Sequence, residues 1–424
     1  AVVLLVAILS IAIVRTFPRF KRIQWLQDSL NQAARENLTG IRVVRAYNAE
    51  AYQEKKFENV NTELLENSLY ANRTMTLLSP FMGLVMNCLN MSIYWIGAVL
   101  ISSVAASGAA GIAARVDIFA DMIVFMSYAM QVIMSFIMIV MVIIIMPRAL
   151  EAAKRISEVL ATQPKVVSGT VTDSGEVSGT VEFKNVSFTY PGGSGNVLSN
   201  VSFKADKGET VAFIGSTGSG KTTLMNLIPR FYDASEGEVL VDGVNVKDYD
   251  LESLYAKIGY VSQKAVMFTG TIEDNVAFGR NADKGMLGEA LEISHSADFV
   301  SELEDKEKAH MARGGTNFSG GQKQRLSIAR ALCRDAEILI FDDTFSALDF
   351  KTDRELRDAL KSRTAGQTKL IVAQRIGTIM SADRIVVLDE GHVVGMGTHR
   401  ELLKTCEVYR QIALSQLSEE ELAI

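Results

Sequence analysis

The sequence lacks paired cysteines and an excess of basic residues, and each absence excludes a class of protein. Its three cysteines, Cys88, Cys333 and Cys406, show no paired spacing, so neither a disulfide framework nor a zinc site is indicated. The net charge of −6 argues against a nucleic-acid-binding protein, which usually presents a basic face. We therefore expect no nucleic-acid partner, and a reducing compartment suits Cys333 and Cys406.

A starting methionine is also absent, and the chain opens inside an apolar run at residues 1–14. This run is shorter than the roughly 20 residues that a transmembrane helix needs. It lacks the basic start and the small-residue cleavage site of a signal peptide. We interpret it as the tail of a spanning helix whose beginning precedes the printed sequence.

Hydrophobic residues make up 48% of the chain and are concentrated before Arg155. Two long apolar segments, at about 74–102 and 118–146, can each cross the hydrocarbon core of a bilayer, with tilt. The composition after Arg155 is that of a soluble α/β domain. The first part therefore predicts an α-helical, multi-pass membrane region, and its expected partner is the lipid bilayer.

Basic residues set the expected orientation of this region. Residues 15–73 are rich in arginine and lysine, whereas the short loop 103–116 contains only Arg115. The positive-inside rule therefore places residues 15–73 and the C-terminal domain in the cytoplasm. Residues 15–73 read as polar helices broken near Leu38–Ile41, either a solvated helix pair or an arm that reaches a cytoplasmic motor.

A stripe of methionines recurs at spacings of three and four residues along the last apolar segment: Met122, Met126, Met130, Met134, Met138 and Met141. These spacings place the side chains along one face of a helix. Such a stripe is typical of packing against a neighbouring helix or lipid. An adaptable wall that faces a ligand is the alternative, because methionine fills irregular gaps.

The second half of the chain alternates apolar strands with helical segments. Residues 162–180 have no helical period and are interpreted as a linker. Buried-type strands follow at Val211–Ile214, Ile338–Phe341, Leu370–Ala373 and Ile385–Leu388. Asp242-Gly243 is a hairpin turn signal between two short strands. The pattern predicts an α/β domain with a mostly parallel sheet and an antiparallel flank.

One segment matches the phosphate-loop pattern G-x-x-x-x-G-K-[ST]: Gly215, Ser216, Thr217, Gly218, Ser219, Gly220, Lys221 and Thr222. It follows the strand Val211–Ile214 directly, and a helical segment begins at Thr223, which is the context that the motif requires. Glycines let backbone amides surround phosphates. We expect Lys221 to bridge the terminal phosphates of ATP and Thr222 to bind Mg²⁺, with Thr223 beside them.

Asp342 ends the apolar strand that begins at Ile338. An aspartate at the end of a strand is more often a helix cap. Together with the phosphate loop, a carboxylate here is expected to hold Mg²⁺, directly or through water.

A second candidate anion site is Ser319, Gly320, Gly321 and Gln322, directly before a helix at 326–333. This segment resembles the signature of the ABC ATPases, with Phe318 in place of the usual leucine. The phosphate loop and Asp342 belong to the same family pattern. The resemblance implies that these four residues bind ATP held by a second ABC subunit. ATP and Mg²⁺ are therefore the expected cofactors.

The resemblance extends to further positions. Tyr190 resembles the aromatic residue that stacks on adenine, and Gln263 the glutamine that contacts Mg²⁺ and signals to the membrane domain. Ser346–Asp349 resembles the loop that crosses the dimer interface, and residues 37–44 resemble the second coupling helix of bacterial ABC exporters. These exporters carry more spans than the printed sequence contains.

The implied layout has a partial membrane domain at 1–160 with a coupling helix near 36–44, a linker at 161–180, an ABC ATPase domain at 181–418 with an antiparallel β subdomain and a helical subdomain, and an acidic tail at 419–424. The resemblance implies a bacterial plasma-membrane protein whose ATPase domain is cytoplasmic.

Two positions depart from the family pattern. Asp343 stands where a glutamate usually polarises the attacking water, and Gln374 stands where a histidine usually contacts the γ-phosphate. An aspartate is one methylene shorter, and a misplacement near 1 Å can lower a rate by about 100-fold. The chain's four histidines, His295, His310, His392 and His399, are expected to be structural or exposed.

These features predict one subunit of a heterodimeric ABC exporter of hydrophobic drugs or lipids. Its own site would bind ATP with impaired hydrolysis, and its intact signature would complete the partner's competent site. The alternatives are a homodimeric exporter with slow hydrolysis and an ATP-gated channel or regulatory subunit.

Overall fold

The computed structural model describes residues 2–104, 108–175, 177–279 and 283–417. The backbone forms two compact units, Ala1–Gln163 and Pro164–Ile424. The first is helical and the second is an α/β domain, which together confirm the predicted fold class.

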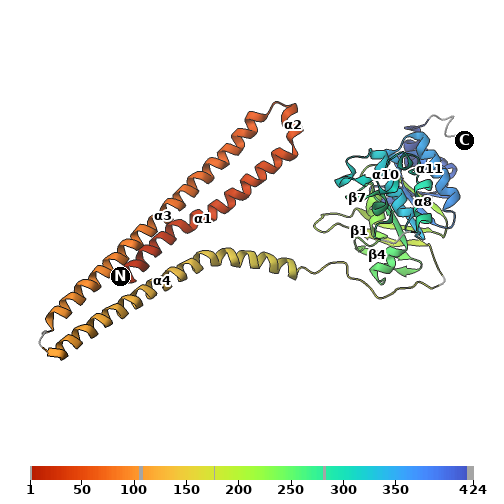
Figure 1. Ribbon diagram of the computed structural model, residues 1–424. Helices are drawn as coiled ribbons and strands as arrows, with labels where there is room; N and C mark the ends of the chain where they lie inside the picture. The colour runs from red at the N-terminus through yellow and green to blue at the C-terminus, as the bar shows by residue number, and fades with distance from the viewer. Residues whose placement is uncertain (1, 105–107, 176, 280–282, 418–424) are drawn as a thin grey trace. The chain divides into compact units, whose positions relative to one another are not determined.

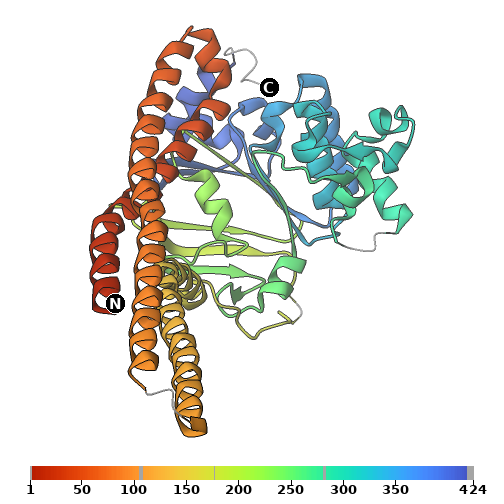
Figure 2. The same ribbon diagram turned by 60° about the vertical axis from the view of Figure 1, so that its left-hand side comes forward.

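The first unit contains four helices among its described residues: α1 (Val2–Thr39), α2 (Ile41–Ala46), α3 (Glu50–Ser103) and α4 (Gly108–Ala161). The predicted break near Leu38–Ile41 is confirmed, because α1 ends at Thr39 and α2 begins at Ile41. Figures 1 and 2 show α1 alongside α3. An ion pair between Arg22 and Glu63 joins them, with an N–O distance of 2.5 Å.

The predicted loop at 103–116 is wrong for most of its length, because α4 already begins at Gly108. The segment is rich in alanine, the strongest helix former, and contains no proline to stop the helix. Two helices are long and apolar enough to cross a membrane among the residues described, within Glu50–Ser103 and Ala109–Phe136.

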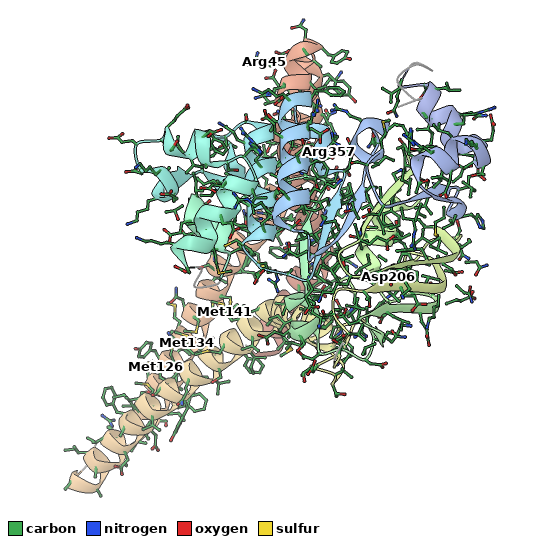
Figure 3. All side chains as sticks on the ribbon, turned by 90° about the vertical axis from the view of Figure 1, so that its right-hand side faces the viewer. Arg45, Met126, Met134, Met141, Asp206 and Arg357 are labelled. Atoms are coloured by element: carbon green, nitrogen blue, oxygen red, sulfur yellow. The ribbon has the colours of Figure 1, made fainter. Side chains whose placement is uncertain are left out.

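Helices α3 and α4 approach closely where Gly97 faces Met122. A Cβ atom added at Gly97 would lie 2.3 Å from the Met122 sulfur, so the missing side chain makes room for the methionine. Further along α4 come Met126, Met134 and Met141 (Figure 3). At Met122, the contact with Gly97 fits the interpretation that the methionine stripe packs against a neighbouring helix.

The second unit is built on a six-stranded sheet with the order β12-β11-β3-β10-β9-β6. Its strands are β12 (His392–Gly397), β11 (Arg384–Asp389), β3 (Thr210–Gly215), β10 (Thr368–Val372), β9 (Ile338–Asp342) and β6 (Ile258–Val261). Only β12 is antiparallel to its neighbour in this sheet. The parallel strands are mostly buried apolar runs, as a sheet covered on both faces requires.

A second, antiparallel sheet has the order β2-β1-β4-β5, formed by β2 (Leu198–Ala205), β1 (Val181–Phe188), β4 (Glu236–Val241) and β5 (Val244–Asn245). The predicted hairpin turn is confirmed, since Asp242 and Gly243 both have positive φ, 53° and 77°. A short pair, β7 (Gly270–Thr271) and β8 (His310–Met311), lies in the helical part.

The helices of this unit are α5 (Lys221–Leu227), α6 (Leu251–Ala256), α7 (Ile272–Ala277), α8 (Lys284–Ile293), α9 (Ala297–Ser301), α10 (Gly320–Leu332), α11 (Phe350–Arg363), α12 (Ile376–Ile379), α13 (His399–Thr405) and α14 (Glu407–Leu414). Three short 3₁₀ turns among the described residues are η1 (Lys306–Lys308), η2 (Arg313–Gly315) and η3 (Thr344–Ala347).

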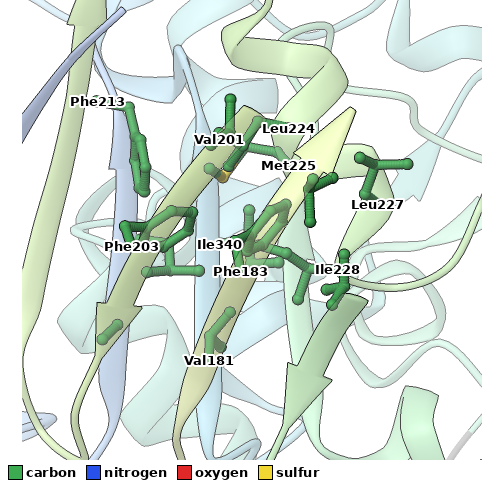
Figure 4. Packing of buried hydrophobic residues seen from close by; sticks show 14 of the residues in the cluster. Val181, Phe183, Val201, Phe203, Phe213, Leu224, Met225, Leu227, Ile228 and Ile340 are labelled. Atoms are coloured by element: carbon green, nitrogen blue, oxygen red, sulfur yellow. The ribbon is translucent and has the colours of Figure 1, made fainter. Parts of the chain in front are cut away.

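Helix α5 is fixed by the core that the two sheets share. Its apolar side chains Leu224 and Met225 are fully buried in a cluster with Phe183 of β1, Phe213 of β3 and Ile340 of β9 (Figure 4). This packing holds the loop between β3 and α5 at one place at the end of the sheet.

Part of the segment predicted as a linker is folded onto the second unit. The Gly169 amide donates to the Tyr249 carbonyl at 2.8 Å, and the Asp250 amide donates to Val171 at 2.9 Å. Val171 and Tyr249 form an isolated β-bridge. We call residues 167–171 the strap, because the buried Arg230 also donates to the Val167 carbonyl at 2.9 Å.

Candidate nucleotide-binding site

The phosphate loop connects the central strand β3 to α5. Gly220 caps the helix with φ 96°, a left-handed conformation that disfavours any side chain. A Cβ atom there would lie 2.7 Å from the Leu198 side chain. The glycine is therefore required both by the turn and by the close approach of β2.

The ammonium group of Lys221 is held inside this loop. It donates to the carbonyls of Gly215 and Ser216 at 2.8 and 2.7 Å and to the Ser219 hydroxyl at 3.2 Å. Burial lowers the pKa of Lys221, and the charges of Asp343 and Asp342 oppose this shift. The three acceptors carry no charge, so the loop keeps a positive group for an anionic ligand. This arrangement fits the phosphates of ATP.

Asp342 and Thr222 meet beside the loop. The Thr222 hydroxyl donates to the Asp342 carboxylate at 3.0 Å, and Asp342 at the end of β9 is only 1% exposed. Burial raises the pKa of Asp342; the Thr222 hydrogen bond opposes this, and Asp343 adds to it. A hydroxyl and a carboxylate are oxygen ligands suited to Mg²⁺, and a cation there would favour the charged aspartate.

The carboxylate of Asp343 receives hydrogen bonds from two amides. Gln263, which follows β6, donates to its Oδ2 at 3.1 Å, and Gln374, which follows β10, donates to the same atom at 2.7 Å. Asp343 has φ 48° and is 6% exposed. Three residues predicted separately from the sequence therefore lie in one network, beside the Asp342 that Thr222 contacts.

Tyr190 contacts α5 at the residue that follows the phosphate loop. Its hydroxyl is 3.1 Å from that of Thr223, and its ring packs edge-on against Phe188 and Tyr232, with centroids 4.9 and 5.1 Å away. The ring is half-buried. Tyr190 is thus connected to the phosphate loop through the residue that follows Thr222.

The signature segment begins α10, which packs in a separate core cluster through Leu326 and Ala329. Ser319 is the N-cap: its hydroxyl accepts from the Gln322 amide at 3.2 Å, and the Gln322 side chain accepts from the Ser319 amide at 2.8 Å. This capping box fixes the start of the helix. The segment is not joined to the Lys221–Asp343 network by any hydrogen bond between the residues described.

The histidines lie away from this network. His310 and His392 are exposed at the starts of β8 and β12, and His295 occupies a turn after α8. His399 is buried with its Nδ1 2.6 Å from the Tyr409 hydroxyl. Among described residues, no group of three histidine, cysteine or acidic side chains could hold a metal ion.

Two contacts of the network had no signal in the sequence. The Ser346 hydroxyl donates to the Asp343 carbonyl at 2.8 Å. Gln416, which follows the last helix, accepts from the Ile376 backbone amide and donates to the Gln374 backbone carbonyl, the groups on either side of Arg375. An isolated glutamine after a helix belongs to no motif, so only the fold could bring it here.

A phosphate loop, a strand-end aspartate and a capped signature helix on this sheet define an ABC-type ATPase domain. Residues 198–346 match the ABC transporter family, and residues 1–136 match the ABC transporter transmembrane region. An uncharacterised ABC transporter ATP-binding protein of Mycobacterium tuberculosis is 39% identical over 411 residues, covering 94% of this chain and 67% of the relative.

Two further relatives are informative. An ATP-dependent lipid A-core flippase of Pseudomonas fluorescens is 35% identical over 394 residues, covering 92% of this chain and 63% of the flippase. The solved structure of a bacterial Atm1-family ABC exporter with ATP bound has a TM-score of 0.82 at 26% identity, covering 99% of this chain and 71% of that one. The chain thus spans about two thirds of the relatives it matches.

The chain belongs to the ABC transporter family and has the half-transporter organisation of an exporter, a membrane region followed by an ATPase domain. It is a chain of an ABC-type ATPase transporter, and ATPase domains of this class bind ATP and Mg²⁺. Half-transporters of this kind work as dimers.

Proposed function

We propose that this chain is one subunit of a heterodimeric exporter whose own nucleotide site binds ATP but hydrolyses it poorly. The observation that carries the proposal is the environment of Asp343. Its carboxylate is bound by two neutral amides, from Gln263 and Gln374, at the place where hydrolysis would need a base and a charged or proton-donating partner.

Both departures weaken the same chemical step. The Gln374 amide donates to Asp343 but cannot take up a proton, as an imidazole near neutral pH can. Asp343 also reaches less far than glutamate, and its Oδ2 is occupied by two donors. A water molecule would compete with these amides for the carboxylate. Binding residues Lys221, Thr222 and Asp342 are retained, so affinity for Mg²⁺-ATP is expected to persist.

The signature segment is proposed to serve the partner's ATP. Ser319 and Gln322 are held by their own capping box, which presents the backbone amides at the start of α10. Helix α10 has 13 residues, and amides at the N-terminus of such a helix favour an anion. The competent site would therefore combine this segment with the partner's phosphate loop.

We assign motor coupling to the α2 region. Val43 and Tyr47 are 61% and 80% exposed at the turn between α1 and α3, and Arg45 lies at the same end (Figure 3). Exposed apolar side chains flanked by arginines suit docking on an ATPase domain of the dimer. We also propose the domain boundaries expected from the sequence: a membrane domain at 1–160 with the coupling helix near 36–44, a linker at 161–180, an ATPase domain at 181–418 and an acidic tail at 419–424.

The transported substrate is proposed to be a lipid or another hydrophobic compound. Similarity to the lipid A-core flippases supports this class. Uptake of a fluorescent lipid into inside-out vesicles tests it. ATP-dependent transport supports it, whereas ATP-gated ion current without transport would favour a channel.

Copurification tests the heterodimer. A tagged, full-length version of this subunit, extracted in mild detergent, should bring down an equimolar second ABC chain with glutamate and histidine at the positions matching Asp343 and Gln374. Recovery of this chain alone, as a dimer that turns over ATP, would show that Asp343 works as a catalytic carboxylate.

A further inference from the structure

The chain after α14 returns to the candidate site. Tyr409 and Ala413 of α14 are fully buried, and Leu417 packs against the same core cluster. Between them, the exposed Gln416 places its side-chain amide over the segment after β10. Its Oε1 accepts from the Ile376 backbone amide and its Nε2 donates to the Gln374 carbonyl, both at 2.8 Å.

The backbone partners fix which end of the Gln416 amide is which. A backbone N–H can only donate and a carbonyl can only accept, so Oε1 must face Ile376 and Nε2 must face Gln374. Ile376 is the first residue of α12, and its N-cap Arg375 makes no side-chain capping bond. Gln416 therefore satisfies a helix-start amide that would otherwise have no intrahelical partner.

We call the two hydrogen bonds from Gln416 to the Ile376 amide and the Gln374 carbonyl the clamp. The clamp is connected to the candidate site through a single residue, Gln374. Gln416 binds the carbonyl of Gln374, and the side chain of Gln374 binds Asp343 Oδ2 at 2.7 Å. Asp343 in turn accepts from Gln263. A continuous series of hydrogen bonds thus joins the end of the last helix to the loop after β6.

We infer that Gln416 is a positioning residue: it holds the backbone around Gln374 so that the Gln374 amide stays on the Asp343 carboxylate. The C-terminal segment thereby acts on the Asp343 carboxylate through Gln374. The expected effect of Gln416 on ATP retention rests on the proposed function, which identifies this site as one that retains ATP. The clamp itself is a property of the folded chain.

Hydrogen exchange of the full-length transporter tests the clamp without nucleotide. Gln416→Ala should speed exchange at the Ile376 amide by about fivefold, which corresponds to about 1 kcal/mol for one net hydrogen bond. Gln416→Glu keeps an acceptor for Ile376 and loses the donor to Gln374, so it should restore part of the protection. Unchanged exchange at Ile376 in Gln416→Ala would overturn the inference.

Gln411→Ala is the matched control. Gln411 is also an exposed glutamine of the C-terminal helix, and its side chain bonds Glu407 of the same helix at 3.2 Å. Its replacement should leave Ile376 protection at the parental value. An equal loss of protection in both variants would mean that general fraying of α14 is the cause, and the clamp would be rejected.

A double-mutant cycle separates positioning from a merely structural role. The measured quantity is the rate at which radiolabelled Mg²⁺-ATP leaves the purified transporter. Gln416→Ala should speed release severalfold in the parental chain and have no effect when Gln374 is already alanine. Equal acceleration in both backgrounds would overturn transmission through Gln374. Efficient hydrolysis at this site would refute the proposed function yet leave the exchange result intact.

Discussion

At the scale of single residues, the charged groups of the candidate site differ in what they are hydrogen-bonded to. Lys221 offers a positive group whose hydrogen-bond acceptors are all neutral, and Asp342 holds a buried carboxylate beside Thr222. Asp343, by contrast, has its Oδ2 atom hydrogen-bonded by two amides. The site is thus prepared for an anion and a cation, while its candidate base is already engaged.

Replacing Lys221 by alanine should remove most of the affinity for ATP. Loss of two hydrogen bonds from a charged donor to phosphate corresponds to about 3 kcal/mol or more, or roughly a 100-fold rise in Kd. Equilibrium titration with a fluorescent ATP analogue measures this. Lys207→Ala, which removes an exposed lysine bonded to Ser178, is the control and should bind normally. An affinity within threefold of the parental value for Lys221→Ala would contradict the assignment.

Asp342 should make the nucleotide-free protein less stable as pH rises. Its folded pKa is raised by burial, so the native state binds this proton more tightly than the unfolded state does. The stabilising contribution is present below the unfolded pKa and is lost as pH rises through the folded pKa. Asp342→Asn should therefore raise the melting temperature at pH 8, by more than at pH 5.5, and abolish stabilisation by Mg²⁺-ATP.

Asp274 provides a control of opposite sign. Its pKa is lowered, first by the Thr271 backbone amide, so its contribution is present above the unfolded pKa and is lost as pH falls. Asp274→Asn should lower the melting temperature at pH 8. A melting temperature of Asp342→Asn at or below the parental value at pH 8 would show that burial of this carboxylate is not costly.

Motif residues could be predicted from the sequence because each motif is local. The phosphate loop needs only a strand, glycines and a helix in succession. The partners of Asp343 could not be predicted, because Gln263 and Gln374 come from the ends of two other strands and meet it only in the folded sheet. Gln416 was missed for the same reason.

At the scale of elements, adjacency of parallel strands builds the site. Strands β3, β10 and β9 are neighbours, so the residues that follow their carboxyl ends converge. These strands were predictable as uninterrupted apolar runs. The early start of α4 at Gly108 was not, because an alanine-rich stretch with glycines reads equally as a loop.

The strap should be sensitive to any side chain at Gly169. A Cβ atom there would lie 2.2 Å from the Asp248 carbonyl oxygen, and backbone cannot move aside cheaply. Gly169→Ala should lower the stability of the second unit by about 1–3 kcal/mol, as overpacking does. Calorimetry can follow the transition that Mg²⁺-ATP raises; Trp25 and Trp95 belong to the first unit, so their fluorescence would not report it.

Gly195→Ala is the control for this change, because a Cβ atom at Gly195 would meet nothing within 4 Å. Its transition should stay within 1 °C, roughly, of the parental value. A Gly169→Ala protein as stable as this control would mean that the strap is not part of the folded second unit.

At the scale of the whole molecule, the chain combines a helical membrane region with an ATPase domain, and family membership makes it a transporter chain that works as a dimer. The proposed division of labour assigns ATP retention to its own site and a signature segment to the partner. That division depends on Asp343 and Gln374 acting together; their side chains are hydrogen-bonded, and the expected binding residues Lys221, Thr222 and Asp342 are present in the same site.

The most direct test measures hydrolysis at this site alone. In the purified dimer, the partner's site is inactivated by removing its phosphate-loop lysine, and single-turnover hydrolysis is followed for parental Asp343 and Gln374 and for the double variant Asp343→Glu, Gln374→His. We predict ATP retained unhydrolysed in the parental protein and hydrolysis faster by about 100-fold or more in the variant. Parental hydrolysis at a rate comparable to the variant would contradict the account.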